Sequence, residues 1–97
     1  MIHGRMAVKN YKNELTKAVA NGESPKGFPS DLVKVARRKL GYLDAATRLD
    51  DLKAPPGNRL HAHTKDREGQ HAIWVNDKYR LCFTEQGPTD VEIVDYH

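Results

Sequence analysis

The spacing of apolar residues changes between the two halves of this chain, and the change restricts the fold to a mixture of helices and sheet. From Ala7 to Asn21, and again from Ser30 to Asp44, apolar residues recur every three or four positions, which predicts two amphipathic helices. From about residue 59 onward, short runs of β-branched and aromatic residues predict strands instead. We therefore expect an α+β protein whose two N-terminal helices pack on one face of a small sheet.

Two tight connections organise the second half. They separate predicted strands at residues 70–76, 79–84 and 91–96, and residues 60–63 are available as a fourth. Short connections of this kind favour an antiparallel meander. We expect a mainly antiparallel sheet of three to five strands. The whole chain, 1–97, is interpreted as one domain, with helices at about 7–44 and the meander at about 59–97.

Composition excludes several classes of protein. No run approaches the roughly 20 apolar residues that span a bilayer, and the first residues lack the apolar run of a secretory signal. We therefore expect a cytoplasmic protein that does not bind a membrane. Cys82 is the single cysteine, so it cannot form an internal disulfide or supply a cysteine-type zinc site. Packing must stabilise the fold.

Positive charge is concentrated in the first half. Residues 1–48 carry ten Lys or Arg against four Asp or Glu, a balance of +6, whereas residues 49–97 carry six against nine, a balance of −3. Lys34, Arg37 and Arg38, with Lys39 at the margin, form a cationic strip opposite the apolar face of the second helix. Such a strip attracts phosphate backbones or an acidic protein, and charge alone does not distinguish these from a solvated helix face.

The polar side chains that suit catalysis are concentrated in the predicted meander. Four of the five histidines lie in the last 37 residues. Arg80 is out of phase with Leu81 and Phe83, so if those two face the helices, Arg80 points to the uncovered face of the sheet. His61 and His63 share one strand face, but no partner motif of metal-ligand spacing accompanies them, so we expect no metal.

Trp74 and Cys82 are interpreted as packing residues. Trp74 lies between Ile73 and Val75, which favours a packing role over a base-stacking platform. Cys82 lies between Leu81 and Phe83 and is expected to be a small buried hydrophobe rather than a nucleophile.

Five short segments match a known family in order and spacing. They are Leu43-Asp44-Ala45-Ala46-Thr47, Asn58-Arg59-Leu60-His61, Asp66-Arg67-Glu68-Gly69, the run from Val75 to Phe83, and the terminal Val94-Asp95-Tyr96-His97. Over about residues 28–97 the chain resembles HigB toxins of the RelE/ParE superfamily. The resemblance implies a RelE-like fold and a ribosome-dependent endoribonuclease that cleaves messenger RNA in the ribosomal A site without a cofactor. It also implies a HigA-type antitoxin that forms a hetero-oligomer with the toxin, with operator DNA contacted only through the antitoxin.

The resemblance assigns catalytic roles to five residues, His61, Arg80, Asp95, Tyr96 and His97. His61 and His97 would share the two proton transfers, and Arg80 would stabilise charge on the phosphate. Tyr96 would orient the ribose or stack a base, and Asp95 would fix a histidine tautomer. Contacts with RNA or the ribosome are expected from Lys34, Arg37, Arg38, Lys65, Arg67 and Lys78.

This chain departs from the family pattern at three places. Thr64 stands where some relatives have a lysine, and Lys65 follows it. Gln70-His71 replaces a common aromatic pair. The first residues are polar where relatives have a short strand, which would leave a sheet edge to be covered.

Two other functions compete with the ribonuclease. A ParE-like toxin would inhibit DNA gyrase by binding it, but such proteins lack the terminal histidine set, so His61, Arg80 and His97 together count against this alternative. A small basic module would bind nucleic acid without catalysis. Growth arrest that persists without His97 would favour either of these over cleavage.

Overall fold

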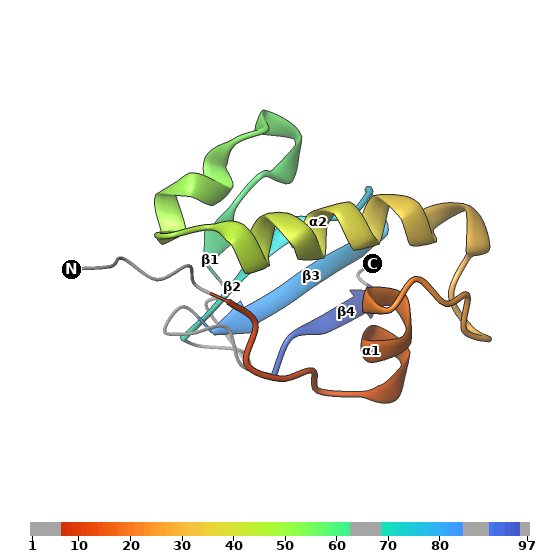
Figure 1. The fold of residues 1–97 in the computed structure, drawn as a ribbon. Helices are drawn as coiled ribbons and strands as arrows, with labels where there is room; N and C mark the ends of the chain where they lie inside the picture. The colour runs from red at the N-terminus through yellow and green to blue at the C-terminus, as the bar shows by residue number, and fades with distance from the viewer. Residues whose placement is uncertain (1–6, 63–68, 85–89, 96–97) are drawn as a thin grey trace.

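A computed structural model gives the fold of the chain and describes residues 7–62, 69–84 and 90–95. The described residues form an α+β structure with a four-stranded antiparallel sheet, which confirms the predicted class (Figure 1). The strands are β1 (His61–Ala62), β2 (Gln70–Trp74), β3 (Tyr79–Thr84) and β4 (Glu92–Asp95), and they lie side by side in sequence order. No helix within these ranges is long and apolar enough to cross a membrane.

The helical half differs from the predicted pair of long helices. It contains α1 (Glu14–Ala20), a 3-10 turn η1 (Ser30–Leu32) and α2 (Val33–Ala45). Two further 3-10 segments, η2 (Leu49–Lys53) and η3 (Pro56–Asn58), connect α2 to the sheet. Figure 1 shows α2 lying across the sheet and α1 beside β4.

The first helix begins seven residues later than Ala7, so the predicted start is wrong. The side chain of Asn13 accepts a hydrogen bond from the Thr16 amide at 2.9 Å and caps α1. Before the cap, the backbone of residues 10–12 pairs with Val91 instead of coiling. The Lys12 amide donates to the Val91 carbonyl at 2.9 Å, and the Val91 amide donates to the Asn10 carbonyl at 3.3 Å. This short parallel pairing covers part of the chain beside β4.

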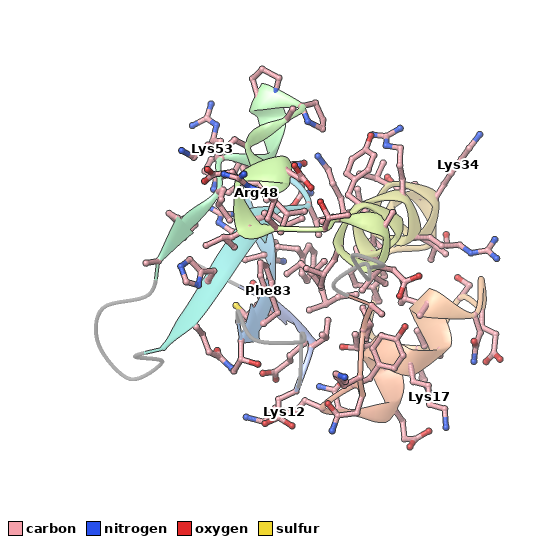
Figure 2. The ribbon with its side chains drawn as sticks, turned by 60° about the vertical axis from the view of Figure 1, so that its left-hand side comes forward. Lys12, Lys17, Lys34, Arg48, Lys53 and Phe83 are labelled. Atoms are coloured by element: carbon pink, nitrogen blue, oxygen red, sulfur yellow. The ribbon has the colours of Figure 1, made fainter. Side chains whose placement is uncertain are left out.

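The core lies between α2 and one face of the sheet. Ile73, Leu81 and Ile93 pair across β2, β3 and β4 and pack in one apolar cluster with Leu43 of α2. Phe83, fully buried, belongs to the same cluster, and Figure 2 shows it in the interior of the molecule. Leu81 and Phe83 therefore face the helices, so the condition set from the sequence is met, and the strand alternation turns Arg80 and Cys82 to the opposite face.

Candidate functional site

The strand register assembles two rows of side chains on the sheet face opposite α2. One row consists of His61, Ala72, Cys82 and Glu92, and the next consists of Trp74, Arg80 and Val94. His61 on β1 and Arg80 on β3 therefore share a face, although β2 lies between them. Their backbones are about 10 Å apart across the strands and about 7 Å along them, a gap that long side chains and a bound nucleotide can span.

This face is less open than the sequence predicts. Ala72 and Cys82 are fully buried, so Cys82 is the expected small buried residue. Arg80 is only 7% exposed. Its guanidinium carbon lies 3.9 Å from the centroid of the Trp74 ring, and Nη1 donates to the Asn76 carbonyl at 2.6 Å. The guanidinium is therefore held flat against the sheet rather than extended into solvent.

A backbone carbonyl orients His61. Its Nδ1 lies 2.9 Å from the carbonyl oxygen of Arg59. Because a carbonyl only accepts hydrogen bonds, Nδ1 must be the donor, and in the neutral ring Nε2 is then the acceptor nitrogen. The contact with the Arg59 carbonyl thus fixes the tautomer of His61, a role that the sequence assigned to Asp95.

Asp95 does not belong to the same rows. It pairs with Tyr79, whose ring packs against Phe28 on the helix side of the sheet. The exposed Asp95 carboxylate lies 4.0 Å from Nζ of Lys78. His71 does not share the position of His61. The His71 ring stacks on Phe83, and the two ring centroids are 6.3 Å apart. Four other predicted site residues lie outside the described ranges, and their roles stay predictions: Tyr96, His97, Lys65 and Arg67.

Most of the predicted cationic strip is on the solvent side of α2. Lys34, Arg37 and Arg38 are exposed, and Figure 2 shows Lys34 directed away from the molecule. Lys39, placed at the margin of the strip by the sequence, is instead buried at 6% exposure. Because α2 covers the other face of the sheet, the strip and the Arg80 row face opposite directions. One phosphate cannot contact both.

Lys39 is buried because it anchors the segment that leads into β1. Its Nζ donates to Oδ1 of Asn58 at 2.6 Å, and Asn58 is fully buried. Burial, with the nearby charge of Arg38 as the smaller cause, lowers the pKa of Lys39. The contact fixes the end of η3, immediately before Arg59.

The sequence did not single out Arg59, and it gave Trp74 a packing role without indicating its two arginine partners. The exposed guanidinium of Arg59 has its carbon 4.2 Å from the centroid of the Trp74 ring, so two arginines contact one indole. Trp74 is only partly buried and lies outside the apolar cluster. The signal was present in the sequence: the alternation that buries Ile73 and Val75 turns Trp74 to the face of Arg80.

Metal-ligating side chains do not cluster in the described ranges: no three His, Cys, Asp or Glu residues there come together as a cation site would require. The groups that the described site does bring together are an oriented imidazole and two guanidiniums stacked on one indole. Such groups bind and polarise a phosphodiester.

Comparison with known proteins identifies the family of the chain. The family model for RelE-like toxins of the type II toxin–antitoxin system HigB matches residues 9–97. The chain therefore belongs to the family of HigB-like toxins.

Two curated relatives share part of the sequence. The chain is 44% identical over 56 residues to Toxin HigB-1 of Vibrio cholerae serotype O1, covering 58% of this chain and 59% of that protein. It is 36% identical over 62 residues to an uncharacterized protein of Haemophilus influenzae, covering 64% and 61% respectively. The matches thus span about three-fifths of each relative.

Proposed function

We propose that this chain is the toxin of a type II toxin–antitoxin module and that it cleaves messenger RNA in the ribosomal A site. The observation that carries the proposal is the shared sheet face of His61 and Arg80, with Nδ1 of His61 held by the Arg59 carbonyl. Membership of the HigB-like family supports the toxin class. The toxin acts in the cytoplasm, where its substrate is.

The chemistry follows from what RNA cleavage requires. The ribose 2′-hydroxyl attacks the adjacent phosphorus, one group removes the hydroxyl proton, and another protonates the departing 5′-oxygen. His61 and His97 share these two transfers in the proposal, since imidazole titrates near neutral pH. Arg80 stabilises the charge that grows on the phosphate oxygens. This acid–base scheme uses no metal.

The remaining predicted residues support this chemistry. Tyr96 orients the ribose or stacks a base, and Asp95 holds the His97 ring, since Asp95 lies apart from the His61 row. Lys65, Arg67 and Lys78 contact RNA or the ribosome. Few proton-transfer groups are available to the toxin, so positioning of the messenger by the ribosome supplies part of the rate.

A HigA-type antitoxin neutralises the toxin in this proposal. The two proteins form a hetero-oligomer, and the antitoxin alone contacts operator DNA. Mixing purified antitoxin with the toxin before ribosomes are added should abolish cleavage. Cleavage that continues at an excess of antitoxin would contradict this part of the proposal.

The decisive experiment is inducible expression of wild type, His97→Ala and Arg80→Gln, with messenger RNA 5′ ends mapped in each culture. We expect cuts at a fixed codon phase in wild type and a loss of those cuts in both variants. Arg48→Gln is the matched control, because Arg48 is an exposed arginine paired with Asp50 at 2.9 Å. Growth arrest without cuts would instead indicate a ParE-like action, which a gyrase supercoiling assay would detect.

A further inference from the structure

The sole tryptophan of the chain contacts two arginines, one from β3 and one from the segment that precedes β1. Arg80 lies directly opposite Trp74 on β3, and Arg59 precedes β1 on the other side of β2. The two guanidinium carbons lie 3.9 Å and 4.2 Å from the same ring centroid. Cation–π attraction of this kind is strongest for tryptophan, so the indole offsets part of the repulsion between the two cations.

The two charges are close enough to act on the same anion. Because they share a ring, they are held within about 8 Å of each other, no farther than the screening length at physiological ionic strength. An anion bound beside the indole therefore experiences both charges. Arg80 is nearly buried and supplies a fixed field, whereas Arg59 is exposed and accessible to a ligand.

Arg59 is held in place by its backbone as well as by the ring. It adopts a left-handed conformation with φ of 48°, which is unfavourable for a residue with a Cβ. The buried contact between Lys39 and Asn58 fixes the residue before it. Its carbonyl orients His61. Among the described residues, the Arg59 guanidinium makes no ion pair that would explain this arrangement.

We propose that Arg59 is a second phosphate-binding residue, and that Trp74 positions Arg59 and Arg80 together to bind the phosphates of a single RNA strand beside His61. The inference rests on the proposed ribonuclease function and adds the residues that hold its substrate. Arg59 binds the phosphate next to the one that reacts, and Trp74 acts only through the two guanidiniums.

A binding experiment without cleavage tests the inference. The full chain is titrated with a single-stranded 2′-O-methyl oligonucleotide, which lacks the nucleophilic hydroxyl, and binding is followed by anisotropy of a label on the RNA. The fluorescence of Trp74 gives a second signal from the site itself. Arg59→Gln should weaken binding roughly tenfold, as expected for one charge-assisted contact. It should also reduce the salt slope by about one ion.

The matched control is Arg48→Gln, which removes the same charge from an exposed arginine paired with Asp50. It should bind RNA as wild type does. Equal affinity of Arg59→Gln and Arg48→Gln, or no change in Trp74 fluorescence on binding, would overturn the inference.

The positioning role of Trp74 requires a double-mutant cycle. Trp74→Leu should weaken RNA binding, and Arg59→Gln should add little in that background, because the ring that aligns the guanidinium is already absent. Trp74→Phe should be intermediate, and it keeps an aromatic ring if Trp74→Leu fails to fold. Fully additive losses would show that Trp74 does not position Arg59.

These experiments distinguish failure of this inference from failure of the proposed ribonuclease function. Normal messenger cleavage with RNA affinity independent of Arg59 overturns only the role of Arg59. An absence of messenger cuts in wild type overturns the ribonuclease itself, whatever the measured affinities are.

Discussion

Nζ of Lys39 donates a 2.6 Å hydrogen bond to Oδ1 of Asn58, and both side chains are buried. The amide nitrogen of Asn58 in turn donates to the carbonyls of Leu52 and Ala54, at 3.1 Å and 3.3 Å. One asparagine thus joins α2 to the backbone of the segment that leads to Arg59 and β1. The side-chain amide of Asn58 thus takes the place of water beside the buried ammonium of Lys39.

Asn58→Ala should therefore lower the free energy of unfolding by about 2–4 kcal/mol. The substitution removes the acceptor of a buried ammonium and the donor for two carbonyls, and unsatisfied buried polar groups cost about 1–3 kcal/mol each. Urea unfolding followed by circular dichroism measures the change. Lys53→Ala, at an exposed lysine in the same region, is the control and should stay within about 0.5 kcal/mol of wild type. A small effect of Asn58→Ala would mean that water replaces the amide.

Stability should rise with pH in the alkaline range because of Lys39. Its pKa is lowered in the folded protein by burial and by Arg38, while the unfolded chain keeps the ordinary value of 10.5. Between the lowered folded value and 10.5, the unfolded state binds more protons, so raising the pH favours the folded state. The difference in unfolding free energy between wild type and Lys39→Met should therefore change in favour of wild type as pH rises toward 10.5. Using the difference cancels Tyr11, whose raised pKa acts in the opposite direction in both proteins. A pH-independent difference would contradict the assignment.

A buried hydroxyl connects α1 to the sheet. Oγ1 of Thr16 accepts a hydrogen bond from the Ile93 amide at 3.0 Å, and Thr16 is fully buried. Thr16→Val keeps the shape but leaves that amide without an acceptor, so we expect a loss of about 1–3 kcal/mol in thermal or urea unfolding. Thr16→Ser keeps the acceptor and removes one methyl group, which should cost about 1 kcal/mol. If the serine variant were the less stable of the two, packing rather than the hydrogen bond would hold α1 in place.

The sequence predicted what depends on local periodicity and missed what depends on side chains meeting across strands. The sequence correctly predicted that Arg80 and Phe83 lie on opposite faces of the sheet, because side chains alternate strictly along a strand. The start of α1 was missed, because Tyr11 fits an apolar helical face although its backbone pairs with Val91, 80 positions away. Only the register, which is a tertiary property, brings Arg59 to Trp74. The Lys39 contact was missed for the same reason.

The strip on α2 should affect ribosome binding and leave the chemistry intact. Combined neutralisation of Lys34, Arg37 and Arg38 to glutamine removes positive charge from the side of α2 that faces away from the sheet. We expect weaker binding to ribosomes at low salt, and a difference from wild type that shrinks as salt is added, because exposed charges are screened.

The arrangement of the two surfaces sharpens this prediction. Because the strip and the Arg80 row face opposite directions, the triple variant should bind a short 2′-O-methyl RNA as tightly as wild type does while it binds ribosomes less tightly. Arg37 also packs over Gly22, where an added Cβ would lie 3.2 Å from Nη1, so a thermal melt must first show that the variant is folded. Neutralising Arg48 and Lys53, which both pair with Asp50, gives a control with exposed charges elsewhere on the surface. Ribosome affinity that is unchanged at low salt would contradict a role for the strip, since electrostatic attraction is strongest under that condition.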